Sequence, residues 1–226
     1  QIEIEKAVTL SQKTDVVILC VGLTPELEGE SYDREDLNLP ADQVELIQAV
    51  TAANPRTIVV LFNATPVLMH DWQMHTPAIL EAFYPGQEGG YALAEILSGE
   101  VNPSGKLPIT LPQKWEDCPA FASYPGEKDV AYYTEGLFVG YRHFDRLKIE
   151  PNFPFGHGLS YTTFEYQNLE ITPVKIQPGA AISVKFQLIN TGRQAGDEVV
   201  QLYLRDVDAR VEREDRALKA VQRGHL

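Results

Sequence analysis

The chain has 226 residues, of which 44% are hydrophobic and 23% are charged, and its acidic residues outnumber its basic residues by 32 to 19. This composition excludes disordered, collagen-like and coiled-coil proteins, and the length allows one full domain and most of a second. The net charge of −13 disfavours nucleic acid and anionic membrane surfaces as partners, because both are polyanionic. No apolar run approaches the roughly 20 residues that would span a bilayer, so we expect no membrane anchor.

Cysteine use and the start of the chain are compatible with either a secreted or a cytoplasmic protein. Two cysteines, Cys20 and Cys118, are too few for a disulfide framework. The first residues lack the basic and apolar stretches of a signal peptide.

The first half of the chain alternates helical patterns with uninterrupted apolar runs. Unbroken runs, unlike alternating ones, are typical of strands buried on both faces of a parallel sheet. Short alternation of strand and helix indicates βαβ units. We therefore predict an α/β domain over residues 1–112, layered, with a mostly parallel sheet and flanking helices. The expected helices are 2–12, 40–54 and 91–97, and the expected strands are 15–22, 57–62 and 78–84.

The second half of the chain changes in character. Seven prolines between residues 103 and 154 break any long helix, and we predict a proline-rich connector over 113–162 that packs on the α/β domain. From residue 163 the apolar residues alternate, as in antiparallel strands. A sandwich of such strands needs about 100 residues, and about 65 remain, so we predict an incomplete all-β domain over 163–226. The mixed-charge tail, 205–223, is expected to be a solvated face or a loop.

An acidic loop, residues 24–39, follows the first predicted strand. Ligands of open α/β sheets bind at the carboxyl ends of the strands, where this loop begins. Carboxylates beside an apolar sheet edge suit proton transfer, because desolvation raises their pKa toward the operating pH. Spacing alone nevertheless favours the plainer interpretation, a solvated acidic face. The loop contains one cation, Arg34, and the carboxylates Glu26, Glu28, Glu30, Asp33, Glu35 and Asp36.

Five sequence blocks follow one another along the chain. They are residues 28–40 (EGESYDREDLNLP), 84–90 (YPGQEGG), 102–108 (NPSGKLP), 135–142 (EGLFVGYR) and 153–162 (FPFGHGLSYT). Together they closely resemble glycoside hydrolase family 3. The resemblance extends to about Lys219 and concerns the family's C-terminal α/β domain and its fibronectin type III-like domain, which the incomplete all-β region would represent. It does not include the family's catalytic barrel.

The resemblance implies roles for particular carboxylates. Family members of the β-glucosidase type use an Asp nucleophile on the barrel and a Glu acid/base on a loop of the α/β domain. That loop typically reads Glu-Gly-Tyr-Asp-Arg, which implies Glu30 as the acid/base, with Ser31 where glycine is common and Glu28 as the runner-up. Asp33 and Arg34 are assigned to loop structure ahead of contact with the sugar. For Arg34 the expected charge partner is Asp33 or Glu30.

The function that the resemblance implies is that of a fragment, clipped at both ends, of a retaining exo-β-glycosidase. The expected reaction is hydrolysis of terminal non-reducing β-D-glucosyl residues of a β-linked oligosaccharide or aryl glycoside, without metal or organic cofactor. The isolated chain is predicted to be inactive because the nucleophile lies on the missing N-terminal barrel domain. A homodimer is compatible with this reading. The alternatives are a β-xylosidase or other exo-glycosidase of the same family, and a non-catalytic carbohydrate-binding or structural module.

Other motifs give no support to a different chemistry. The glycines of 86–90 lack the phosphate-binding pattern Gly-x-x-x-x-Gly-Lys-Ser/Thr, and no Gly-x-Gly-x-x-Gly follows the first strand. Residues 155–161 lack the Gly-x-Ser-x-Gly of a nucleophile elbow, which disfavours a serine hydrolase. The histidines and cysteines have no metal-ligand spacing. Trp72 and Trp115 are expected to pack in the core rather than stack on sugars.

Overall fold

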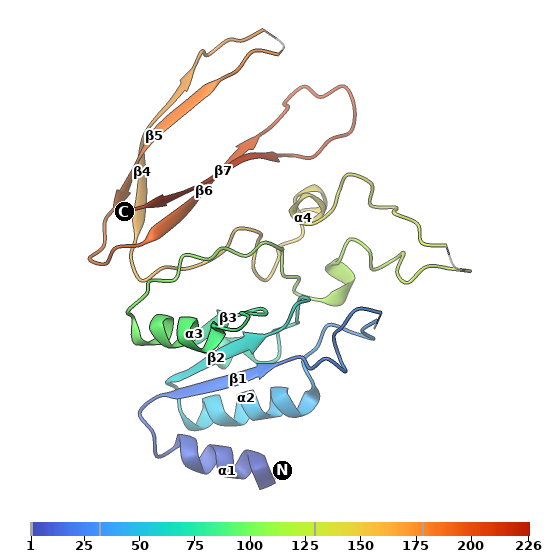
Figure 1. Cartoon of the computed structure of the whole chain (residues 1–226). Coiled ribbons are helices and arrows are strands. Elements are labelled where there is room, and N and C mark those ends of the chain that lie inside the picture. Colours follow the sequence, from blue (N-terminus) through green and yellow to red (C-terminus); the bar gives the residue numbers. More distant parts are fainter. Residues whose placement is uncertain (1, 32, 129, 178) are drawn as a thin grey trace. The chain divides into compact units, whose positions relative to one another are not determined.

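The computed structural model describes residues 2–31, 33–128, 130–177 and 179–226 (Figure 1). Two compact units divide the chain. The first comprises the described residues of 1–93 and Ile109–Phe155, and the second comprises Ala94–Pro108 and the described residues of Gly156–Leu226. The domain boundaries expected from the sequence, at 112 and 162, stay a prediction. The helices and strands are α1 (Ile2–Ser11), β1 (Val17–Gly22), α2 (Ala41–Ala53), β2 (Thr57–Phe62), β3 (Ala78–Glu81), α3 (Gly89–Ser98), α4 (Tyr141–Leu147), β4 (Phe164–Thr172), β5 (Ser183–Asn190), β6 (Asp197–Leu204) and β7 (Ala217–His225), with short 3-10 turns at Gln73–His75 and Trp115–Asp117.

The first unit contains a parallel sheet in the order β1-β2-β3. Val17 pairs with Thr57 and Ile58 pairs with Ala78, so the three strands run in register and end at one edge. The β-branched residues of β1 and β2 favour strand formation. The helices α1 and α2 are stacked below the sheet in Figure 1. The expected parallel α/β arrangement is confirmed.

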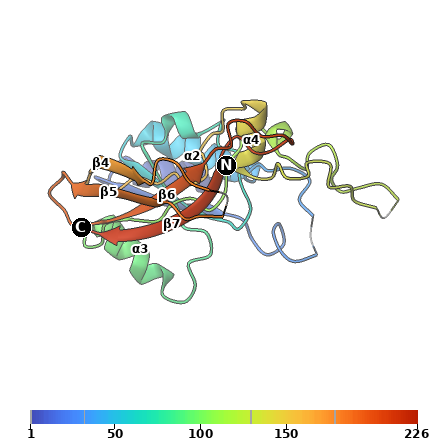
Figure 2. The same cartoon turned by 90° about the horizontal axis from the view of Figure 1, so that it is seen from above.

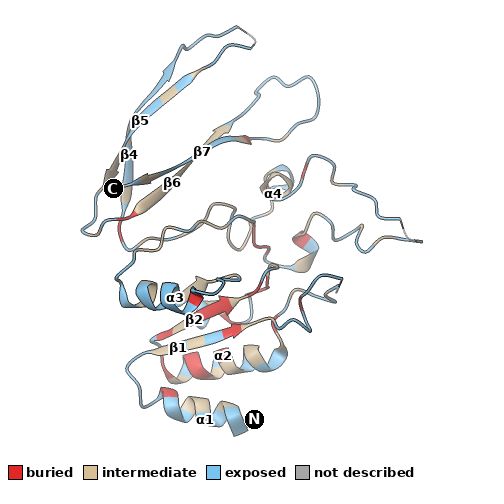
Figure 3. Ribbon diagram, in the orientation of Figure 1, coloured by how far each residue is buried: buried red, intermediate tan, exposed pale blue. Residues whose placement is uncertain are grey.

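The core of the first unit lies on β2 and the elements that touch it (Figure 3). Both faces of β2 are buried, as its unbroken apolar run predicts. For β1 that prediction is wrong, because Ile18 is 52% exposed and Cys20 is also exposed. The reason is position: β1 is an edge strand of the sheet, whereas β2 is central. The fully buried side chains include Ile47, Val50, Val59, Val60, Leu61, Val67, Met69 and Trp72.

Polar side chains join the ends of these elements. Asn54, at the C-terminus of α2, donates from Nδ2 to the carbonyls of Ser11 and Thr14, each at 2.9 Å. Its Oδ1 accepts from the Arg56 N–H at 2.8 Å. At the other end of the layer, the Gln43 side chain accepts from Gly22 N–H and donates to Gly22 C=O, both at 2.8 Å. The helix α2 is therefore tied at its C-terminus to the connection between α1 and β1, and at its N-terminus to the end of β1.

A short helix, α4, occurs in the stretch expected to be an extended connector. It begins after Gly140 and ends at Lys148, which both have positive φ, and it buries Phe144. The guanidinium of Arg146 lies 3.9 Å from the ring centre of Phe138. The helix is possible because no proline occurs between residues 125 and 151, a local signal that the overall proline content obscured.

The second unit contains two antiparallel strand pairs, β4–β5 and β6–β7, which lie side by side in both views (Figures 1 and 2). The fibronectin type III-like assignment stays a prediction. Of the two options expected for 205–223, a loop or a solvated face, the loop is wrong for the last part, because β7 pairs with β6 along Ala217–His225. Backbone pairing requires no apolar alternation, and most β7 side chains are exposed, so the charged sequence did not reveal the strand.

We predict that Gly22→Ala destabilises the first unit. A Cβ at this position would lie 2.0 Å from the backbone oxygen of Phe62, which is part of the sheet and cannot yield without disturbing it. We expect a loss of about 2–3 kcal/mol in the free energy of unfolding, measured with urea. The matched control is Gly90→Ala in α3, where a Cβ meets nothing within 4 Å. That change should be neutral or stabilising by up to about 1 kcal/mol, and equal losses in the two variants would contradict the steric argument.

Candidate active site

Three loops leave the same edge of the parallel sheet. They are residues 23–40 after β1, 63–77 after β2 and 82–88 after β3. Parallel strands place all three loops at one edge, which is where ligands bind in sheets of this class. The acidic loop expected from the sequence therefore lies beside the loops that follow β2 and β3.

Glu28 fastens the acidic loop to both neighbours. It is 7% exposed, and its Oε1 accepts the Ala64 N–H at 2.5 Å and the hydroxyl of Tyr84. Its Oε2 accepts the Thr65 N–H at 2.8 Å and the Thr65 hydroxyl at 2.5 Å. Both oxygens are thus occupied by donors, as a buried carboxylate requires. Glu28 ties together the loops that follow all three strands.

These hydrogen bonds keep the Glu28 carboxyl ionised. Burial alone raises its pKa, but the donors from Thr65, Tyr84 and Ala64 together outweigh burial and lower it below the ordinary value of 4.5. The same contact raises the pKa of Tyr84, because its hydroxyl proton is held by the carboxylate. This environment favours the ionised form of Glu28 at neutral pH.

Arg34 makes a second attachment of the loop. Its Nη1 donates to Thr65 Oγ1 at 2.8 Å and to the Pro66 carbonyl at 3.1 Å, and its Nη2 donates to the Asn38 carbonyl at 2.9 Å. The Thr65 hydroxyl therefore accepts from Arg34 while it donates to Glu28. Burial lowers the pKa of Arg34, and the charges of Glu28 and Asp36 raise it. The charge partners of Arg34 are thus Glu28 and Asp36. They are not Asp33 or Glu30, the partners expected from the sequence.

Asp33 contacts a different loop. The hydroxyl of Tyr124 is hydrogen-bonded to Asp33, and this contact raises the pKa of Tyr124. Tyr124 belongs to the segment between the turn at Trp115–Asp117 and α4. Asp33 and Arg34 therefore connect the acidic loop to two separate parts of the first unit.

Glu30 is placed differently from Glu28 on the same loop. Its side chain is exposed, whereas Glu28, two residues earlier, is buried. The next residue, Ser31, has φ of 70°, a left-handed conformation that costs a non-glycine residue about 1 kcal/mol or more. This conformation gives a physical reason for the glycine that is common at this position. The backbone therefore turns sharply directly after Glu30.

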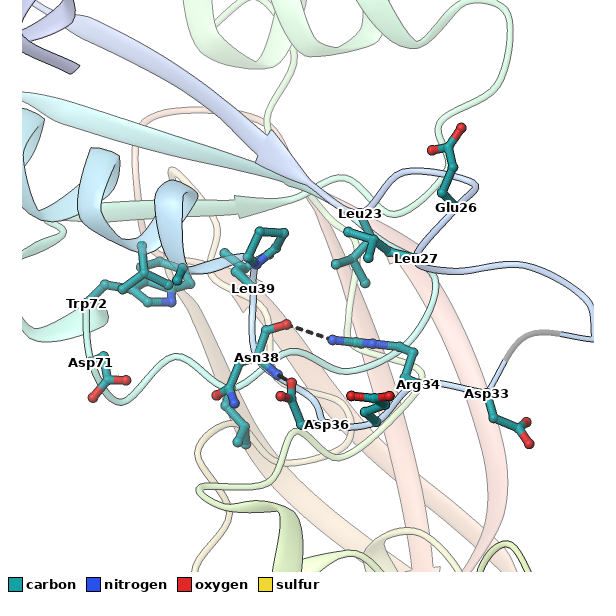
Figure 4. Close-up of a pocket in the computed structure, with 15 residues that line it drawn as sticks. Leu23, Glu26, Leu27, Asp33, Arg34, Asp36, Asn38, Leu39, Asp71 and Trp72 are labelled. Carbon is teal, nitrogen blue, oxygen red and sulfur yellow. Dashed lines mark hydrogen bonds between the residues drawn. The ribbon is translucent and has the colours of Figure 1, made fainter. Parts of the chain in front are cut away.

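A pocket of about 660 Å³ lies between the acidic loop and the segment 68–72 (Figure 4). Its polar wall carries Arg34, Asp36 and Asn38, and its apolar wall includes Leu39 and the buried Trp72. Figure 4 shows the Arg34 guanidinium directed at the Asn38 backbone. Glu30 is not among the residues that line this pocket. A ligand that meets Glu30 would therefore approach from outside the pocket.

Within the described ranges, no group of three or more His, Cys, Asp or Glu side chains could hold a metal ion. None of the helices in those ranges combines the length and apolar character needed to cross a membrane.

Several residues of this site were missed in the sequence. Thr65 and Tyr84 hold Glu28, and Glu81, at the end of β3, lies close enough to Glu28 for the two charges to interact. A usable signal existed, since Asn63 and Thr65 follow the predicted strand 57–62, Tyr84 ends the predicted strand 78–84, and Glu81 is the one charged residue within that strand.

Comparisons with known proteins agree on one family. Residues 1–161 match the glycosyl hydrolase family 3 C-terminal domain. The chain is 43% identical over 223 residues to thermostable beta-glucosidase B of Acetivibrio thermocellus. This alignment covers 99% of this chain and 29% of that protein. It is 40% identical over 227 residues to probable beta-glucosidase I of Emericella nidulans, covering 99% of this chain and 27% of that one.

Solved structures give the same result. The crystal structure of beta-glucosidase from Kluyveromyces marxianus in complex with glucose has a TM-score of 0.92 and 41% identity, over 99% of this chain and 26% of that one. The family 3 beta-glucosidase from Bifidobacterium adolescentis has a TM-score of 0.93 and 38% identity, over 99% and 33%. The chain therefore spans between a quarter and a third of the length of these relatives.

We predict that Glu28→Gln destabilises the first unit by about 3 kcal/mol, because an amide NH₂ would face donors that need an acceptor. The pKa of Glu28 is lowered on folding, so its contribution is present above pH 4.5 and is lost as pH falls below that value. Urea unfolding of wild type and variant across this range measures the difference in the free energy of unfolding, which should shrink on acidification. The control is Glu35→Gln, an exposed residue of the same loop. A difference that does not depend on pH would contradict the ionised state of Glu28.

Proposed function

Since the chain belongs to glycosyl hydrolase family 3, we propose that it supplies the general acid/base, Glu30, to a retaining exo-β-glycosidase. The proposed reaction is hydrolysis of terminal non-reducing β-D-glucosyl residues. In support, the relatives named above are β-glucosidases, and one of them is described in complex with glucose. The substrate would be a β-linked oligosaccharide or an aryl glycoside.

The contrast between Glu28 and Glu30 carries the assignment. Both oxygens of Glu28 are occupied by hydrogen-bond donors, and its pKa is lowered, so it is suited to holding the loop rather than to transferring protons. Glu30 is exposed and stands two residues from that fixed point. A proton carrier needs this combination of a free carboxyl and a supported backbone, because it must reach the substrate in a defined position.

The proposed chemistry needs a second carboxylate. In retaining cleavage, one carboxylate attacks the anomeric carbon, while the other protonates the departing oxygen and then deprotonates a water molecule. Glu30 would perform both proton transfers. The nucleophile, proposed to be an Asp on a barrel domain, would come from polypeptide outside these 226 residues. The two carboxyls should stand about 5–5.5 Å apart in the assembled enzyme.

The assignment is tested in the longer protein that contains this chain. Glu30→Ala should lower kcat/KM for cellobiose by about 10²–10⁴-fold, the usual contribution of acid catalysis, and much less for aryl glucosides whose leaving groups need no proton. Added azide should restore part of the aryl glucoside turnover and yield the β-glucosyl azide. The comparison variant is Glu28→Ala, which should lower kcat/KM for both substrates to a similar extent, because the loop loses its support. Azide should not rescue this variant. Wild-type cellobiose hydrolysis in Glu30→Ala, with loss in Glu28→Ala, would move the role to Glu28.

A second prediction concerns the chain by itself. Because one carboxylate of the pair is proposed to lie elsewhere, the isolated 226-residue chain should hydrolyse an activated aryl β-glucoside no faster than the uncatalysed reaction. The release of the phenol measures this, and the longer protein at equal concentration is the positive control. Turnover by the chain that disappears in its Glu30→Ala variant would show a nucleophile within these residues and contradict the proposal.

A further inference from the structure

Asn63, which is buried, and Glu81, which is half-buried with its Oε2 shielded from solvent, form a polar pair that the proposed reaction does not use. Glu81 is the last residue of β3 and pairs with Leu61, and Asn63 lies two residues beyond Leu61 on the same face of the sheet. The two side chains are within hydrogen-bonding contact. They sit where the loops after β2 and β3 begin, next to the residues that receive Glu28.

When Glu81 is ionised, two oxygen atoms of the pair lack a hydrogen-bond donor. Glu81 Oε1 accepts the Phe83 N–H at 3.2 Å, but Glu81 Oε2 is buried without a described partner. Asn63 donates from Nδ2 to the Thr65 carbonyl at 2.8 Å, and its Oδ1 is also buried without a described partner. Two buried acceptors without donors on contacting side chains are costly, whereas one proton shared between them would satisfy both.

We propose that Glu81 is a positioning residue that acts in its protonated form. Its Oε2–H donates to Asn63 Oδ1, and Asn63 in turn holds the Thr65 carbonyl, so that the N–H groups of Ala64 and Thr65 stay directed at Glu28. When Glu81 releases its proton to solvent, this chain of hydrogen bonds is broken and a second negative charge appears beside Glu28. The attachment of the loop that carries Glu30 then weakens. Only the last step, from loop to activity, rests on the proposed function.

On balance the electrostatics of the site favour protonated Glu81, because burial outweighs the contacts with Phe83 and Asn63 that stabilise its ionised form. Burial raises the pKa of Glu81 to about 7, the Phe83 N–H and the Asn63 side chain lower it, and the charge of Glu28 raises it. The other ionisable groups of the cluster act on Glu28: Tyr84 by a hydrogen bond to its carboxylate, and Arg34 by its charge and through the Thr65 hydroxyl. Loss of the Glu81 proton therefore occurs near neutral pH and leaves a second carboxylate beside the ionised Glu28.

The direct test follows the carboxyl carbons of ¹³C-labelled glutamates by NMR in the full 226-residue chain. Wild type should show one carboxyl that titrates at about pH 7 and is absent in Glu81→Gln, which mimics the protonated acid. The exposed Glu45→Gln on α2 should retain that titration. If the Gln variant fails to fold, Glu81→Asp can replace it, because the loss of the glutamate signal in that variant also assigns the titrating carboxyl to Glu81. Titration of Glu81 at the ordinary value of 4.5 would overturn the proposal.

Hydrogen exchange tests the consequence for the loop without any assay of activity. The protection of the Ala64 and Thr65 amides, corrected for intrinsic exchange, should fall in wild type as pH rises through 7. We expect a fall of about tenfold, which corresponds to one pKa unit of coupling between the two carboxylates. In Glu81→Gln the protection should stay constant over the same range. Identical pH dependence in both proteins would overturn the positioning role.

Activity of the longer protein completes the test. With an aryl glucoside that needs no acid assistance, kcat/KM of wild type should fall above pH 7 about tenfold more than that of Glu81→Gln. A pH profile that is the same in both overturns the link from Glu81 to the loop of the enzyme. Failure of the Glu30→Ala prediction, with the titration and the exchange intact, would refute the proposed function instead and leave the protonated pair established.

Discussion

A buried carboxylate, Glu28, connects the three loops that leave the carboxyl edge of the parallel sheet. Its two oxygens receive donors from the loop after β2 and from Tyr84 beyond β3, while its own backbone belongs to the loop after β1. The parallel register makes this possible, because it brings the ends of all three strands together. Without an acceptor at this point, the backbone N–H groups of Ala64 and Thr65 would be left without their partner, and the acidic loop would lose its main attachment.

The anchor explains how one loop can hold carboxylates in opposite environments. Glu28 is held ionised by its donors, Arg34 shares the Thr65 hydroxyl with it, and Asp33 reaches the Tyr124 hydroxyl. Glu30 takes part in none of these described contacts and is exposed just before the strained turn at Ser31. The sequence environment of the two glutamates is nearly the same. Their physical environments differ because only one of them faces the backbone of the neighbouring loop.

The strands of the parallel sheet could be predicted because burial on a central strand leaves a plain record in the sequence. The run at β2, Thr57–Phe62, was predicted to the residue, and α2 differed only at its ends. The strand β7 could not be predicted, since its charged side chains face solvent and its pairing uses only the backbone. The main-chain partners of Glu28 were hidden for the same reason. Two of its donors are main-chain N–H groups, which leave no trace in the identities of Ala64 and Thr65.

The family resemblance, now established by the match over residues 1–161, supplied the functional hypothesis that spacing alone could not give. An acidic loop is an ordinary solvated feature, and nothing in the run of carboxylates separates Glu30 from its neighbours. The structure adds the environment of each carboxyl. It also adds Glu81 and Asn63, whose adjacency depends on the register between β2 and β3 and so required the sheet itself.

The decisive measurement is a crystal structure of the longer protein, trapped as its covalent glycosyl-enzyme with a fluorinated glucoside. We expect the Glu30 carboxyl at about 5–5.5 Å from the nucleophile and within about 3 Å of a water molecule poised over the anomeric carbon. Glu28 should still accept the N–H groups of Ala64 and Thr65. A structure in which Glu30 faces away from the sugar, while Glu28 or another carboxylate occupies that position, would contradict the division between anchor and acid.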